Sequence, residues 1–205
     1  MQRGYFLSLD GMDGAGKSTQ CVQLADWLRT QHREVVLCHD PGGTEVGQAL
    51  REIVLHHRGQ IGLECEALLF MASRAQLVRE VIRPALERGQ IVLADRFLLA
   101  NVVYQGHAGG LNPGDLWQVG AFCTGGLEPD MTLILDLPLD IAATRRKPAA
   151  DRMESRGDAY FSKVRAGFLA EAARRPERCR IIDASGDAAS VQQKLREAVA
   201  KNIDK

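Results

Sequence analysis

The stretch YFLSLDGMDGAGKST, residues 5–19, indicates how this 205-residue chain folds. Residues 5–10 are mainly apolar and predict a buried strand. The eight residues that follow, GMDGAGKS, fit the pattern G-x-x-x-x-G-K-[ST], and apolar side chains at helical spacing continue over 18–31. Glycines let backbone N–H groups turn towards phosphate oxygens, and the N-terminus of the helix adds partial positive charge. This strand, loop and helix therefore predict a phosphate-binding loop.

The rest of the chain alternates short apolar runs with helical ones. Further strands are predicted at 34–38, 91–95, 131–136 and 180–183. Helical periodicity is present over 44–57, 63–88, 114–124 and 159–174. Strands that are apolar throughout are typical of parallel sheets buried on both faces. We predict an α/β fold, a three-layer sandwich with a five-stranded parallel sheet flanked by helices, as a single domain over 1–205.

Parallel α/β sheets bind ligands at the carboxyl ends of their strands. Four acidic residues lie at or just past the predicted ends: Asp10, Asp40, Asp95 and Asp136. The sequence therefore places the candidate site at this edge of the sheet.

Composition restricts the classes of partner. The chain has 26 basic and 26 acidic residues, so it has no overall field to hold nucleic acid or an anionic membrane surface. No apolar run approaches the length of a membrane span. The five cysteines are odd in number and contain no C-x-x-C pair, which favours reduced thiols over disulfides or structural zinc. We expect a cytoplasmic protein without nucleic-acid or membrane partners.

The glycine loop predicts a nucleotide site that works with Mg²⁺. Lys17 is expected to reach the β- and γ-phosphates of ATP, and the Ser18 hydroxyl to bind the metal. Asp95 ends a strand and can hold the same ion or its water, although a surface ion pair with Arg96 is the alternative. The expected nucleotide-binding residues are Gly11, Met12, Asp13, Gly14, Ala15, Gly16, Lys17, Ser18 and Thr19.

The class of phosphate-loop protein follows from other motifs. A GTPase would carry D-x-x-G after a strand together with N-K-x-D for guanine, and N-K-x-D does not occur. A small kinase needs an acceptor site and an arginine-rich flap that excludes water. Residues 145–156, RRKPAADRMESR, suit such a flap, and a mobile lid is expected at about 145–157. A solvated basic helix surface is the alternative reading of the same residues.

Six segments, taken in order, resemble bacterial thymidylate kinases over nearly the whole chain. They are LDGMDGAGKST (9–19), DPGGT (40–44), LLFMASR (68–74), DRFLLANVVYQG (95–106), EPDMTLILDLP (128–138) and DRME (151–154). The resemblance implies that the γ-phosphate of MgATP is transferred to dTMP, giving dTDP and ADP in dTTP synthesis. It also implies a homodimer, for which Leu68, Met71, Ala75, Val78 and Ile82 are candidate contacts unless they form core.

The resemblance assigns roles by position. Asp13 matches the residue beside the acceptor's 3′-hydroxyl, Phe70 the ring that stacks on thymine, and Arg74 the donor to a thymine carbonyl. Read from the residues alone, Phe70 and Tyr104 could be core, and Arg74 could lie on a helix surface. The remaining implied roles are Arg51 and Arg96 at the acceptor phosphate, Asn101 and Gln105 at the base, Tyr104 against the sugar and Arg152 as the lid arginine. The implied catalytic set is Lys17, Asp13, Asp95, Arg96 and Arg152.

Several positions depart from the family pattern. Asp10 and Asp40 are one methylene shorter than the usual Glu, which predicts contacts through water or a shifted backbone. His107 begins a segment that lacks the usual Arg. The alternatives are a kinase for another nucleoside monophosphate or for a deoxynucleoside, with Asp10 as base, and a non-catalytic nucleotide-binding regulatory protein.

Overall fold

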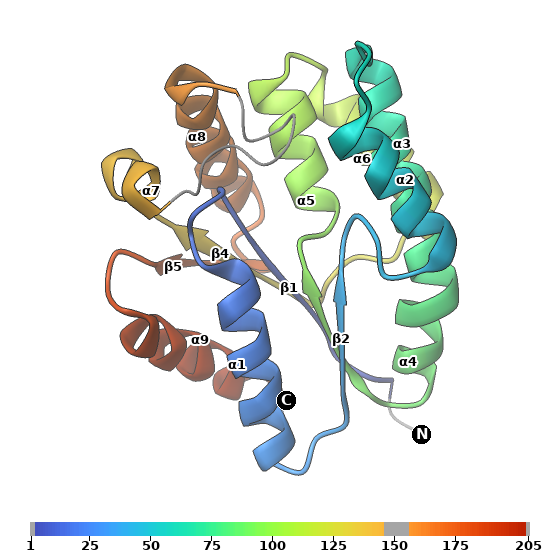
Figure 1. Ribbon diagram of the computed structural model, residues 1–205. Helices are drawn as coiled ribbons and strands as arrows, with labels where there is room; N and C mark the ends of the chain where they lie inside the picture. Colours follow the sequence, from blue (N-terminus) through green and yellow to red (C-terminus); the bar gives the residue numbers. More distant parts are fainter. Residues whose placement is uncertain (1–2, 146–155, 204–205) are drawn as a thin grey trace.

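A computed structural model describes residues 3–145 and 156–203, and these form a five-stranded parallel sheet with helices on both faces (Figure 1). The strand order is β2-β3-β1-β4-β5, with β1 at the centre. The strands are β1 Phe6–Gly11, β2 Val35–His39, β3 Ile91–Asp95, β4 Met131–Asp136 and β5 Cys179–Asp183. The predicted fold class is confirmed, and every predicted strand end lies within one residue of the observed one.

The central strand is buried on both faces because each face packs against a different layer. Leu7 and Leu9 lie in the hydrophobic cluster that includes Leu24 of α1 (Lys17–Thr30). Phe6 lies in a second cluster with residues of α3 (Leu63–Leu77) and α4 (Arg83–Glu87). All six residues of β1 are buried, as expected for a central strand of a parallel sheet.

The predicted helices are present, but the one expected over 63–88 is not uniform. Its α3 part continues through a π-helical turn, Val78–Ile82, into α4. Pro84 stands at the start of α4 and has no N–H to donate to the preceding turn, which accounts for the local change of helix type. The other predicted helices are α2 Glu45–His56, α6 Pro113–Thr124 and α8 Asp158–Arg174.

The candidate dimer stripe on this helical run is largely core. Met71, Val78 and Ile82 are buried, whereas Leu68 is 55% exposed. Only the outer part of the predicted stripe is therefore available to a partner.

Two further helical regions complete the layers. α9 (Ala188–Ile203) packs beside α1 on one face (Figure 1), with Val191, Leu195 and Val199 buried at intervals of four. The sequence analysis assigned no helix after residue 183, which was wrong, because this spacing is a helical signal. α5 (Leu98–Asn101) runs into a π-helical segment, Val102–Ala108, and α7 (Leu139–Arg145) follows β4. None of the described helices is long and apolar enough to cross a membrane.

The carboxyl ends of the strands share one edge. Leu9 of β1 and His39 of β2 are both in register with Asp95 of β3, so the loops after these strands are adjacent. Asp40 follows β2 directly, as predicted. Asp136 at the end of β4 accepts two bonds from Arg165 of α8, at 2.7 and 2.8 Å, and is committed to an ion pair.

Candidate active site

A cleft of about 820 Å³ lies at this edge of the sheet and gathers most of the predicted site residues. Those that line it are Asp13, Gly14, Gly16, Lys17, Ser18, Thr19, Arg51, Phe70, Arg74, Asp95, Arg96, Asn101, Tyr104 and Gln105. Gly11, Met12 and Ala15 are buried within the loop itself. Arg152 lies outside the described residues. One cleft therefore holds both the phosphate-binding loop and the predicted acceptor residues.

The phosphate loop has the backbone geometry that its glycines allow. Gly11 and Gly16 have φ angles of 137° and 85°. A Cβ on Gly11 would lie 2.6 Å from the carbonyl oxygen of Leu135, so no side chain fits there. Lys17 donates from Nζ to the carbonyl of Met12 at 2.8 Å. Burial, with the nearby charge of Arg96, lowers the pKa of Lys17 to about 8.

Asp13, Arg96 and Tyr104 form a compact cluster beside the loop. Arg96 donates from Nη2 to one carboxylate oxygen of Asp13, and the Tyr104 hydroxyl donates to the other at 3.0 Å. The Arg96 guanidinium also lies over the Tyr104 ring, 4.9 Å from its centroid. Burial favours the neutral form of Asp13, but Arg96 and Lys17 outweigh it and hold the pKa of Asp13 below its usual value. The cluster keeps a cation next to the phosphate loop.

Ser18 and Asp95 are bonded to each other in the cleft, and the charge of Asp95 acts on the buried Asp10. Ser18 donates from Oγ to Oδ2 of Asp95 at 2.5 Å. Asp10 is fully buried, and neither of its carboxylate oxygens has a hydrogen-bond partner among the described residues. No group of three or more His, Cys, Asp or Glu side chains in this part of the chain could hold a metal alone. One or two protein oxygens supplemented by phosphate and water suit Mg²⁺, so the residues fit this ion.

The predicted base-contacting residues form a buried polar chain. Arg74 is 2% exposed and donates from Nε to Asp40 at 2.6 Å and from Nη1 to Oδ1 of Asn101 at 3.0 Å. Asn101 donates from Nδ2 to Oε1 of Gln105 at 2.9 Å. Arg74 is therefore no helix-surface residue. The shorter Asp40 contacts Arg74 directly, so of the two expected routes, water or a shifted backbone, this contact does not use water.

Phe70 and Arg51 reach the same cleft from α3 and α2. Phe70 and Tyr104 belong to the hydrophobic core and also line the cleft, so the core and binding interpretations are compatible. Arg51 donates from Nη1 to the carbonyl of Pro41 at 2.7 Å. His107, one of the departures, instead contacts Glu171 of α8 at 2.8 Å and does not line the cleft.

Two residues hold this pocket from behind: Glu66, which the sequence did not single out, and Arg156, which it placed only in the expected flap. Glu66 of α3 is 1% exposed and accepts from Nε2 of Gln105 at 3.0 Å and from Nη2 of Arg156 at 2.9 and 2.8 Å. Arg156 also donates to the Tyr160 hydroxyl, which donates to the carbonyl of Tyr104 at 2.7 Å. An acid in the first turn of a helix usually complements the helix dipole, so the sequence carried no signal for this buried role.

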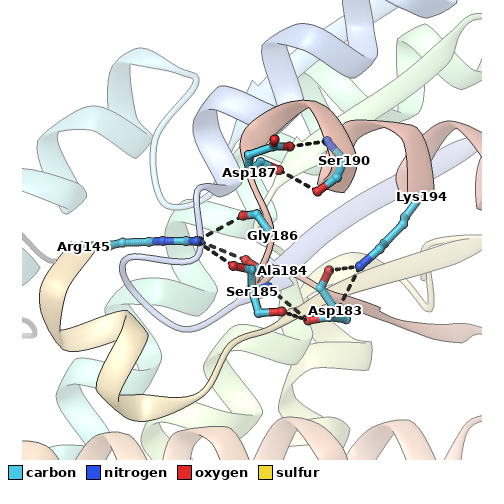
Figure 2. A network of polar contacts seen from close by, with 8 residues as sticks. All are labelled: Arg145, Asp183, Ala184, Ser185, Gly186, Asp187, Ser190 and Lys194. Atoms are coloured by element: carbon cyan, nitrogen blue, oxygen red, sulfur yellow. Dashed lines mark hydrogen bonds and ion pairs between the residues drawn. The ribbon is translucent and has the colours of Figure 1, made fainter.

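Arg145, at the end of α7, is bound to the loop after β5 (Figure 2). Its guanidinium donates to three successive carbonyls, those of Ala184, Ser185 and Gly186, at 2.9, 3.0 and 3.1 Å. Lys194 of α9 holds the same loop through Asp183 (Figure 2). Arg145 therefore acts as a clamp at the rim of the cleft. Most of the lid expected at about 145–157 lies outside the described residues.

Comparison with known proteins supports the reading of this cleft. A family model for thymidylate kinase matches residues 9–195. The chain belongs to the thymidylate kinase family. A member from Rhodopirellula baltica is 45% identical over 192 residues, 94% of this chain and 78% of that protein. One from Kosmotoga olearia is 43% identical over 200 residues, covering 97% and 94%. The crystal structure of thymidylate kinase from Ehrlichia chaffeensis has a TM-score of 0.79 at 27% identity and covers 96% of this chain and 99% of its own.

Proposed function

We infer that this enzyme transfers the γ-phosphate of ATP to dTMP, giving ADP and dTDP as a step of dTTP synthesis. Membership of the thymidylate kinase family carries the activity. The observation that supports it in this chain is that one cleft is lined both by the phosphate loop and by Arg74 and Arg96, the predicted acceptor residues. A kinase needs donor and acceptor held side by side, whereas a nucleotide-binding regulator needs only the first.

The proposed donor half is the loop 11–19. Its backbone N–H groups and Lys17 would bind the ATP phosphates. Ser18 and Asp95 would hold Mg²⁺, which would neutralise charge on the phosphates when bound. Replacing Asp95 with Asn should raise the Mg²⁺ concentration needed for half-maximal turnover, and an unchanged Mg²⁺ titration would contradict this assignment.

The proposed acceptor half uses cations and a stacking surface. Arg96, with Arg51 as a second cation, suits the dianionic phosphate of dTMP because a guanidinium offers paired donors. Phe70 would stack on the base, and Tyr104 and Asp13 would lie against the sugar. Arg74, Asn101 and Gln105 would recognise the base edge.

The chemistry asks for positioning and charge stabilisation more than for covalent catalysis. An oxygen of the acceptor phosphate attacks the γ-phosphorus while the bond to the bridging oxygen breaks, and ADP leaves with that electron pair. The attacking oxygen is already anionic, so no strong base is required. Lys17 and Arg96 would stabilise the negative charge that is spread during transfer. From its sequence match, Arg152 is proposed as a further cation.

A coupled ADP-release assay tests the activity. We expect turnover with dTMP to exceed that with dUMP, dCMP, dGMP and AMP, and little ADP without an acceptor. Best activity with dCMP or AMP would contradict the acceptor assignment. Equal ADP release with and without acceptors would favour a weak hydrolase instead.

We also propose a homodimer in the cytoplasm. Apolar side chains are exposed on adjacent helices: Val46 and Ile53 on α2, Leu68 on α3 and Phe122 on α6, which is 87% exposed. Such a surface is typical of a face that another chain covers. All five cysteines are free thiols, which supports a reducing compartment.

A further inference from the structure

Two amide side chains connect a buried carboxylate, which can only accept hydrogen bonds, to a buried guanidinium, which can only donate them. Glu66 accepts from Gln105, Gln105 accepts from Asn101, and Asn101 accepts from Arg74. A carboxylate can only accept and a guanidinium can only donate. The two amides between them therefore have a single consistent orientation, with each amide nitrogen directed towards Glu66 along the chain.

Of these four hydrogen-bonded residues, Glu66 is the one that does not line the cleft. Gln105, Asn101 and Arg74 line the cleft, whereas Glu66 lies behind them and is 1% exposed. Its negative charge is matched by Arg156, whose side chain stacks over the Tyr160 ring with 4.9 Å to the centroid. Burying a charge costs desolvation free energy unless the charge is paired and hydrogen-bonded, and Glu66 is both.

We propose that Glu66 is a positioning residue for the acceptor base, acting through Gln105 and Asn101. An amide free to turn over presents its oxygen in one orientation and its nitrogen in the other, and so accepts a carbonyl or an amino group alike. Glu66 restricts that freedom for Gln105 from one end of the chain, as Arg74 does through Asn101 from the other. The pocket then offers one pattern of donors and acceptors, which separates thymine, with a carbonyl at ring position 4, from cytosine, with an amino group there.

This inference rests on the proposed function, because it takes Arg74, Asn101 and Gln105 as the base-recognising residues. The test is the ratio of kcat/KM for dTMP to kcat/KM for dCMP. Oε1 of Glu66 accepts from both Gln105 and Arg156, and Oε2 accepts from Arg156 alone. Glu66→Gln removes the charge and replaces one of these oxygens by an NH2 group, which meets the donors of Arg156 or Gln105, so Gln105 is held less firmly. We expect the ratio to fall by about fivefold or more, with KM for ATP unchanged.

A matched control is Glu64→Gln, which changes an exposed acid in the same turn of α3 and should leave the ratio unchanged. A double-mutant cycle tests the route. If Glu66 acts through Gln105, Glu66→Gln should have no further effect on the ratio in a Gln105→Ala background. A purely structural role would lower activity towards dTMP and dCMP alike.

The outcomes separate this inference from the proposed function. If the unmodified enzyme does not prefer dTMP, the proposed function fails before any variant is made. If it does prefer dTMP and Glu66→Gln keeps the ratio within about twofold, or the cycle is additive, only the role of Glu66 fails. Should Glu66→Gln not fold, Glu66→Asp retains the charge but withdraws it by one methylene from Gln105, and the same fall in the ratio is expected.

Discussion

Lys17 is the residue on which phosphate transfer depends most directly in the proposed site. Its Nζ is buried in the loop and bonded to the carbonyl of Met12. Lys17→Ala removes a preorganised cation, so kcat should fall on the order of 10²-fold or more. Lys163→Ala changes an exposed lysine of α8 and should leave kcat unchanged. Near-normal kcat in Lys17→Ala, measured by ADP release, would rule out the proposed role.

Arg152 is the residue for which the argument rests on sequence alone. If it touches only the transferring phosphoryl group, Arg152→Ala should lower kcat on the order of 10²–10³-fold and leave KM for dTMP nearly unchanged. Steady-state kinetics with each substrate varied in turn distinguish the possibilities. Full kcat with a raised KM for ATP would instead make Arg152 a ground-state binding contact.

Asp10 should make stability depend on pH. Burial raises its pKa from 3.8 to about 6, although Arg96 opposes the rise. The folded state therefore holds this proton more tightly than the unfolded state, and the free energy of unfolding falls as pH rises from about 4 to about 6. Asn cannot ionise, so Asp10→Asn should not show this fall in the free energy of unfolding. Above pH 6 the variant should be more stable than the parent protein by about 1–3 kcal/mol.

Thermal unfolding of the nucleotide-free protein across this pH range checks the expectation for Asp10. The difference in Tm between variant and parent should be small near pH 4, grow up to about pH 6 and then stay constant. Asp115→Asn, an exposed acid of α6, serves as the control. A Tm difference that is independent of pH would show that Asp10 is not a buried ionised group.

At the scale of elements, Arg145 joins the end of α7 to the loop after β5 through the three hydrogen bonds described above. Arg145→Ala removes three hydrogen bonds from a charged donor, so stability should fall by about 1–2 kcal/mol. Because Arg145 also lines the cleft, KM for ATP should rise while kcat changes little. Arg88→Ala, at the exposed end of α4, is the control. A large loss of kcat would mean that Arg145 carries transition-state charge.

At the scale of the molecule, the exposed apolar face of α2, α3 and α6 predicts self-association. Leu68→Glu or Phe122→Glu places a charge in that face and should convert the dimer to a monomer in sedimentation velocity experiments. Ile181→Glu changes an exposed apolar residue on the edge strand β5 and should leave the dimer intact. A parent protein that already sediments as a monomer would contradict the proposed homodimer.

The sequence alone was sufficient to predict the features of the fold that depend on a local residue pattern. The glycine loop between a strand and a helix, and five apolar runs, predicted the parallel sheet and the edge that carries the cleft. The same reasoning overlooked α9, although Val191, Leu195 and Val199 have helical spacing. The family motifs placed Arg74, Arg96 and Tyr104 among site residues because their order along the chain is distinctive.

Only the tertiary structure decided which polar groups pair across the fold. Glu66 and Arg156 are 90 residues apart and form a partly buried ion pair, and Arg145 reaches a loop 40 residues away. Local sequence reports helix and strand preference, which depend on neighbours within a turn or two. Ion pairs and hydrogen bonds depend on which elements the sheet topology brings together, so an exposed-looking Glu and Arg became partly buried partners only when α3, the π-helical segment and α8 packed against one another.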